Sequence, residues 1–136
     1  MFDLQPYKQN YIHFVEAGFI AINQGDEEAA HKLFSAATLL NPENTLPKIG
    51  FGYFHLCKLE IKSACQYFEE VLAKEPENEM AKTFLGLSLS FSASKSQEGE
   101  DKLKKALDEV KDPQVKSLTK SALSFVEKFI KKPFSH

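Results

Sequence analysis

Four histidines are the side chains of this 136-residue chain with the clearest capacity to bind a metal ion or move a proton. A helical metal site of the HExxH kind needs two histidines one turn apart. None of His13, His31, His55 and His136 has a partner at that spacing. We therefore expect structural or solvated roles for all four, and no metal site.

Acidic pairs and cysteines are the next candidates for chemistry. The adjacent carboxylates Glu27 and Glu28 fall where a first helical turn is expected, so they complement the helix dipole. Cys57 and Cys65 are eight residues apart and form no CxxC pair, so both are expected to be reduced. The glycines form no phosphate-binding loop, and no GxSxG motif occurs. The sequence therefore predicts no enzyme and no cofactor.

The charge and composition exclude further classes of protein. The chain has seventeen basic residues, all lysine, and nineteen acidic residues, which gives a net charge of −2. This balance does not favour broad nucleic-acid binding, and without arginine there is no bidentate fork for phosphate. No 18-residue apolar stretch predicts a membrane span, and the first residues do not resemble a secretory signal. We expect one domain, residues 1–136, that stays in the cytoplasm.

Lysines gather toward the C-terminal end of the chain. Such a cluster could contact an acidic partner or anionic lipid, but a solvated face is the simpler interpretation. Its members are Lys102, Lys104, Lys105, Lys128, Lys131 and Lys132.

An internal repeat of 34 residues defines the elements that carry these side chains. Gly18, Gly52 and Gly86 are spaced by 34, and three further pairs have the same spacing. The pairs are Ala30 and Ala64, Phe34 and Phe68, and Pro42 and Pro76. A period of this length indicates stacked supersecondary units.

Each unit has the pattern of a helix hairpin. A glycine allows two helices to cross closely, and a phenylalanine such as Phe34 fills the space between successive hairpins. A proline such as Pro42 follows the second helix and cannot continue it. The repeats are expected at residues 11–44, 45–78 and 79–112. The third is irregular, with a serine-rich turn at 88–96 that could also be interpreted as a linker.

A final amphipathic helix follows Asp112 and Pro113, which form a helix cap and a first-turn proline. Such a helix would cover the open end of the stack. The fold class is therefore all-α, a superhelix of three hairpins plus a C-terminal capping helix at 113–132. The expected helices are Pro6–Asn23, Glu27–Leu40, Thr45–Lys58, Ile61–Lys74, Glu79–Phe91, Glu98–Lys111 and Pro113–Lys132.

The first helices of stacked hairpins line a concave surface, and positions 2, 5, 9 and 12 of each unit point into it. Most of these positions are apolar here, which favours a groove for a partner's amphipathic helix. One alternative is that these residues are ordinary core, because the helices curl tightly or a terminal segment of the chain folds back over them. Another is that a homodimer covers them. The expected groove residues are Ile12, Val15, Phe19, Ile22, Leu46, Ile49, Tyr53, Leu56, Met80, Leu87 and Phe91.

The chain resembles tetratricopeptide (TPR) proteins, and within them the chaperones of bacterial type III secretion. The repeat residues carry the first resemblance. Residues 100–128, with Asp112-Pro113 leading into the last helix, resemble the needle-subunit chaperones. Residues 18–40 resemble the early hairpins of the translocator chaperones. The resemblance covers roughly residues 11–132.

This resemblance implies a bacterial cytoplasmic chaperone that holds a helix of the needle subunit and delays its polymerisation. It also implies a small co-chaperone at the N-terminal hairpin, in contact with Phe2, Leu4, Tyr7 and Tyr11. A chaperone of translocator proteins is one alternative. Another is a TPR scaffold that joins two proteins through its convex face.

Overall fold

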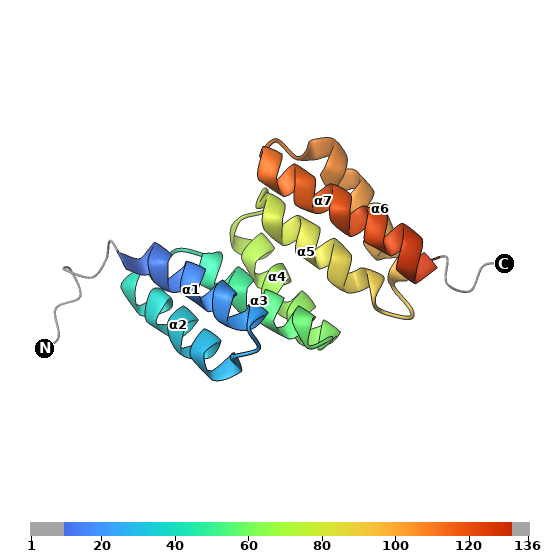
Figure 1. Cartoon of the computed structure of the whole chain (residues 1–136). Coiled ribbons are helices and arrows are strands. Elements are labelled where there is room, and N and C mark those ends of the chain that lie inside the picture. The colour runs from blue at the N-terminus through green and yellow to red at the C-terminus, as the bar shows by residue number, and fades with distance from the viewer. Residues whose placement is uncertain (1–9, 132–136) are drawn as a thin grey trace, which may run out of the picture.

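The computed structural model describes residues 10–131, and this part of the chain is helical throughout, with turns between helices and no strand (Figure 1). None of the described helices is both long and apolar enough to cross a membrane. The helices are α1 (Tyr11–Asn23), α2 (Glu27–Leu40), α3 (Leu46–Cys57), α4 (Ile61–Lys74), α5 (Glu79–Ser90), α6 (Ser96–Glu109), α7 (Pro113–Phe125) and the π-helical η2 (Val126–Lys131).

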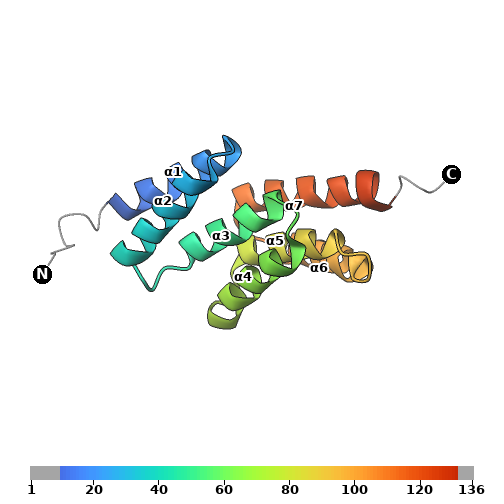
Figure 2. The same ribbon diagram turned by 90° about the horizontal axis from the view of Figure 1, so that it is seen from below.

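The helices pack as three consecutive hairpins followed by α7 (Figures 1 and 2). The pairs α1–α2, α3–α4 and α5–α6 form the hairpins, and α2–α3 and α4–α5 contacts join one hairpin to the next. The first helices also touch in sequence, α1 with α3 and α3 with α5, and α7 packs against both α5 and α6. The three hairpins and α7 therefore form an elongated row in which each unit packs against the next (Figure 1).

Glycines lie where the helices of the first two hairpins cross, as the 34-residue period predicts. A Cβ atom on Gly18 would lie 2.6 Å from the Phe34 ring, and one on Gly52 would lie 2.5 Å from the Phe68 ring. The Phe34 ring also lies 2.4 Å from the position of a Cβ on Gly50, in the next hairpin. Phe34 therefore packs within its own hairpin and joins it to the following one.

In the third hairpin, α5 and α6 cross at two glycines, Gly86 and Gly99. A Cβ atom on Gly99 would lie 2.4 Å from the backbone nitrogen of Ser90 and 2.6 Å from the carbonyl oxygen of Gly86. Ser88 and Ser90 are buried, and their hydroxyls donate to the carbonyls four residues earlier, at 2.7 and 2.8 Å. Ser90 thus lies in the close contact between α5 and α6, and the two helices pack as a hairpin rather than as parts separated by a linker.

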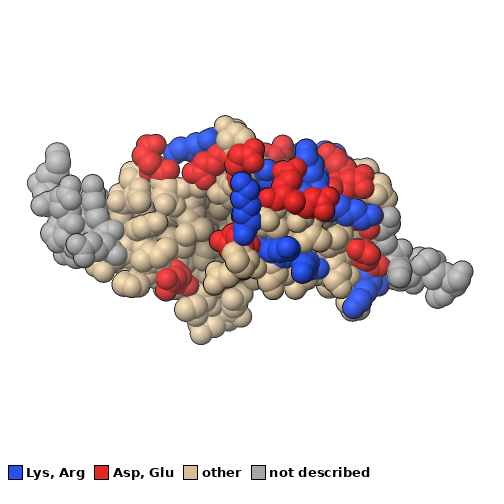
Figure 3. Space-filling model, turned by 90° about the horizontal axis from the view of Figure 1, so that it is seen from above, with Lys and Arg blue, Asp and Glu red and all other residues tan. Residues whose placement is uncertain are grey.

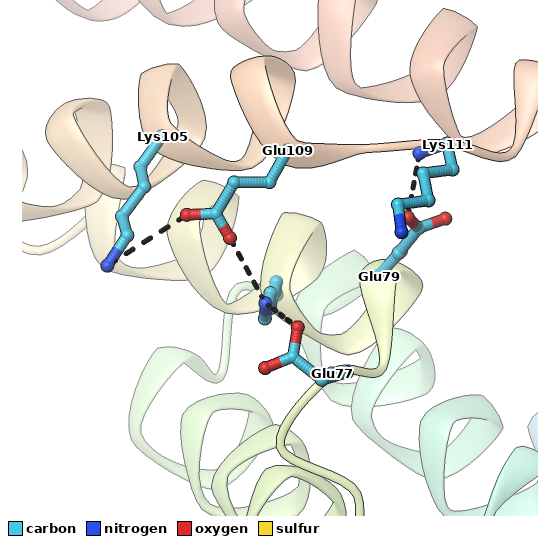
Figure 4. A network of polar contacts seen from close by, with 6 residues as sticks. Glu77, Glu79, Lys105, Glu109 and Lys111 are labelled. Carbon is cyan, nitrogen blue, oxygen red and sulfur yellow. Dashed lines mark hydrogen bonds and ion pairs between the residues drawn. The ribbon is translucent and has the colours of Figure 1, made fainter.

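Polar contacts fasten α7 to the third hairpin. The Thr83 and Thr119 hydroxyls are buried and 2.7 Å apart, and Thr119 donates to the Val115 carbonyl, so Thr83 donates to Thr119. The Glu79 carboxylate accepts a hydrogen bond from the backbone nitrogen of Lys111 at 2.7 Å (Figure 4). It accepts a second from the backbone nitrogen of Asp112 at 3.2 Å. These bonds fix the turn that leads into α7.

An ion-pair network lies beside that turn. Lys82 bridges Glu77 and Glu109, with N–O distances of 3.2 and 3.4 Å, and Lys105 lies 4.0 Å from Glu109 (Figure 4). Burial alone would lower the pKa of Lys82, but its bonds to the two glutamates outweigh burial and raise it. The network therefore connects α5 and α6 at the same end of the molecule as the α7 turn.

Candidate binding surfaces

The fifth position of each repeat is buried, which corrects part of the predicted groove. Val15, Ile49 and Thr83 are at most 2% exposed and lie in the helix-packing interior. Leu56, at the twelfth position, is only 7% exposed. Val15 belongs to the core cluster of the first hairpin, and Ile49 and Leu56 to the cluster between the second and third hairpins. These side chains hold the helices together and are not free to line a groove.

The second and ninth positions remain half-buried in all three repeats. All but Ile12 pack against a core cluster, and all keep part of their surface open. We call this surface, with Ile22 of α1, the first-helix face. Its residues are Ile12, Phe19, Ile22, Leu46, Tyr53, Met80 and Leu87.

Tyr53 joins the three hairpins along this face. Its ring centroid lies 5.8 Å from that of Phe19 and 5.6 Å from that of Phe84. Its hydroxyl donates to Asn23 Oδ1 at 3.1 Å. Burial, followed by its hydrogen bond with Cys57, raises the pKa of Tyr53 to about 12. Because Tyr53 contacts α1 and α5 as well as solvent, its replacement would disturb packing and binding together.

The expected co-chaperone contacts are only partly within the described chain. Phe2, Leu4 and Tyr7 lie outside the described residues. Tyr11 is half-buried, and its hydroxyl accepts a hydrogen bond from Asn44 Nδ2 at 3.0 Å. This bond ties the start of α1 to the α2–α3 turn, so Tyr11 has a structural role within the N-terminal hairpin.

A groove of about 880 Å³ lies along α4 and the α5–α6 turn, and sequence patterns did not predict it. Its apolar floor includes the buried Cys65 and Leu89, and burial raises the pKa of the Cys65 thiol, with a further rise from Glu69. We call this feature the α4 groove. Its lining is Ile61, Lys62, Cys65, Gln66, Glu69, Glu70, Ala73, Leu89, Ser92 and Lys95.

An exposed aromatic cluster lies where α7 passes into η2. The centroids of Phe91 and Phe125 are 6.0 Å apart, and those of Phe125 and Phe129 are 5.1 Å apart. Phe125 is 41% exposed and Phe129 is 63% exposed. We call Phe91, Phe125 and Phe129 the C-terminal aromatic patch. Of these, only Phe91 was predicted from the sequence to be a binding residue.

His55 and Glu60 are engaged in local contacts. His55 Nδ1 lies 2.8 Å from Glu60 Oε1, and its ring stacks on Tyr67 with centroids 5.4 Å apart. The hydrogen bond with His55 lowers the pKa of Glu60. Within residues 10–131, no group of three or more His, Cys, Asp or Glu side chains is arranged to hold a metal ion.

Charge is distributed unevenly along the molecule. Seen from above, the N-terminal half of the surface is mostly uncharged, whereas lysines and acidic residues crowd together over the C-terminal half (Figure 3). Fold and surfaces together define an all-helical protein with repeated hairpins and exposed apolar regions. Comparisons of the chain with protein-family models, with curated proteins and with solved structures found no match.

Proposed function

We propose that the three hairpins and α7 form a TPR-like superhelix whose first-helix face binds a helical segment of a type III secretion needle subunit. The chain would act in the bacterial cytoplasm as a non-enzymatic chaperone. Its apolar contacts with the needle subunit would replace the contacts that needle subunits make with one another. The subunits would therefore not polymerise before export. A small co-chaperone would bind at the N-terminal hairpin.

The regular spacing of half-buried apolar side chains is the observation that carries this proposal. Ile12, Leu46 and Met80 recur at intervals of 34 residues, and so do Phe19, Tyr53 and Leu87. They lie on α1, α3 and α5, which contact one another in order. An amphipathic helix presents apolar anchors at i, i+3, i+4 and i+7, which suits such a surface.

The test should change the face without breaking the core. We choose Ile12→Asp together with Met80→Asp, because both side chains are half-buried and lie at opposite ends of one row. Loss of two apolar contacts of about 1.5 kcal/mol each predicts at least a 10-fold weaker complex. The measurement is the amount of needle subunit, encoded in the same genome, that co-purifies after co-expression.

Leu39→Asp is the matched control, since Leu39 is an apolar residue of α2 that is 68% exposed. It should leave the complex intact, and circular dichroism should show equal helicity in all variants. Normal capture of the needle subunit by the Ile12→Asp, Met80→Asp variant would exclude the first-helix face. Capture of a translocator protein in place of the needle subunit would support the translocator-chaperone alternative.

The α4 groove favours a second candidate function, a scaffold that joins two proteins through its convex face. Its 880 Å³ volume and apolar floor offer a docking place outside the first-helix face. In a scaffold, Ala73→Arg in this groove would weaken a partner's binding, and changes in the first-helix face would be silent. The same co-purification measurement separates the two functions.

A further inference from the structure

The C-terminal aromatic patch combines exposed rings with two exposed lysines, and Glu127 lines a neighbouring hollow with the same lysines. Lys120 and Lys128 line a shallow hollow of about 430 Å³ together with Phe125 and Phe129. The remaining lining residues, Ser121 and Ser124, are small and uncharged. Lys120 thus precedes the two rings along the helix, and Lys128 lies between them in the sequence.

This end of the chain is basic although the protein as a whole is acidic. Residues 113–131 contain four lysines and one acidic residue, Glu127, for a net charge of +3, whereas the whole chain carries −2. The other residues therefore sum to −5. Among the described side chains, the ion pairs involve lysines of α2 to α6 and the turn after α3, and none involves Lys116, Lys120 or Lys128.

The position of α7 makes the patch accessible to a broad surface. α7 and its continuation η2 come last in the row, and within the described chain no further hairpin packs beyond them. In Figure 2 its C-terminal end runs along the edge of the molecule. A groove for a peptide needs walls on two sides, but these rings stand on an outer helix. A planar layer with an apolar interior and an anionic surface fits this arrangement better.

We propose that the C-terminal aromatic patch adsorbs to an anionic membrane surface. The rings of Phe125 and Phe129 enter the boundary between headgroups and acyl chains, and Lys120 and Lys128 contact the anionic headgroups. Adsorption is peripheral and reversible. It would bring the chaperone and any bound client to the membrane, while the first-helix face remains a separate site for the client.

Vesicle co-sedimentation of the full chain tests this proposal. The probes are vesicles of phosphatidylcholine alone and vesicles in which a quarter of the lipid is phosphatidylglycerol. We expect binding to the anionic vesicles only, with loss of binding when salt is raised from 0.1 to 0.5 M, because salt screens the lysines.

Paired substitutions separate the patch from overall charge. Lys120→Gln with Lys128→Gln should weaken partitioning about 25-fold, at about 5-fold for each lysine. Lys62→Gln with Lys102→Gln removes the same charge from exposed positions on α4 and α6 and should change it less than about 3-fold. Phe125→Ser with Phe129→Ser should abolish binding, and thermal melts should show that this variant stays folded.

Three outcomes would overturn the proposal. Equal binding to neutral and anionic vesicles would show that charge plays no part. Equal losses of partitioning in the two double lysine variants would show that the lysines of the patch are not special. If the wild type failed to sediment with anionic vesicles at low salt, the membrane proposal would be wrong, and an acidic protein would be the remaining partner for the patch. None of these results depends on needle-subunit binding, which is measured separately.

Discussion

Two turn residues that are 34 positions apart both have a positive φ although only one is glycine. Gly25 has φ of 78° and Leu59 has φ of 58°, both in the left-handed region. Glycine adopts this region freely, whereas a side chain there costs about 1 kcal/mol. Leu59 is also 63% exposed, so burial offsets little of that cost.

We expect Leu59→Gly to raise the free energy of unfolding by about 0.5 to 1 kcal/mol, since the gain in the folded turn exceeds the added freedom of the unfolded chain. Urea denaturation monitored by circular dichroism measures this change. Gly25→Ala is the reciprocal control and should lower stability by about 1 kcal/mol. A lower stability of Leu59→Gly would show that the leucine side chain contributes packing that outweighs its backbone strain.

Glu75 connects the end of α4 to the start of α3. Its Oε1 accepts hydrogen bonds from Asn78 Nδ2 at 2.9 Å and from Thr45 Oγ1 at 2.8 Å. The bond from Asn78, followed by that from Thr45, lowers the pKa of Glu75 below its ordinary value of 4.5. The charged carboxylate therefore stabilises the fold above pH 4.5, and this contribution is lost as pH falls through the lowered pKa.

Glu75→Gln should remove that part of the acid sensitivity. Between pH 5 and pH 3, the stability of the wild type should fall more steeply than that of the variant, as measured by urea midpoints at each pH. Glu43→Gln is the control, because Glu43 pairs with Lys74 at a side chain that is 90% exposed. Parallel pH profiles for wild type and Glu75→Gln would contradict the assignment.

The 34-residue spacing in the sequence predicted which residues pack within a repeat. It did not predict how closely the repeats approach one another. The contacts of Gly18 with Phe34 and of Gly52 with Phe68 follow from the 34-residue period. The burial of Val15 does not, because a helical period places a residue on a face and leaves the width of the groove undetermined. The α4 groove likewise depends on three-dimensional packing between α4 and the α5–α6 turn.

Among the elements, the third hairpin departs most from the repeat. α6 was predicted to begin at Glu98 but begins at Ser96 and ends at Glu109, and its Gly99 rather than an alanine meets α5. The bounds of α2 and α4 match the predicted ones, because an acidic or polar start and a following proline mark both ends. The π-helical η2 was not predicted, since its apolar residues continue the spacing of an ordinary α-helix.

The backbone contact between α5 and α6 makes Gly99 the strictest small-residue position of this hairpin. In an unconstrained helix, Gly to Ala would be favourable by about 1 kcal/mol. At Gly99 the added methyl would meet the Ser90 nitrogen at 2.4 Å and the Gly86 carbonyl oxygen at 2.6 Å, and neither is a flexible side-chain end. We expect Gly99→Ala to lower the free energy of unfolding by about 2 kcal/mol or more, measured by urea denaturation.

Ser117→Ala on the exposed side of α7 is the control for helix propensity and should be neutral or slightly stabilising. A Gly99→Ala protein as stable as the wild type would mean that α5 and α6 separate without cost. In that case the buried serines, rather than the glycine pair, would set the distance between the two helices.

Contacts between the helices join each hairpin to its neighbours along the chain. α1 and α2 contact each other and α3, whereas α7 contacts α5, α6 and η2. Stability in such a stack is the sum of each unit's own stability and its interfaces with adjacent units. The two ends of the chain should therefore respond separately to a local change.

Leu123→Asp tests this separation, because Leu123 lies with Leu103, Ala122 and Val126 in the core cluster that joins α7 to the third hairpin. A buried, unpaired carboxylate should detach α7, since burying it without a partner costs several kcal/mol. Hydrogen exchange should then accelerate in α5, α6 and α7, with little change in α1 and α2. Ser124→Asp, at an exposed neighbouring position, should leave every segment unchanged. Equal acceleration in α1 would instead show that the three hairpins and α7 unfold as one cooperative unit, in which α7 stabilises the whole stack and not its last hairpin alone.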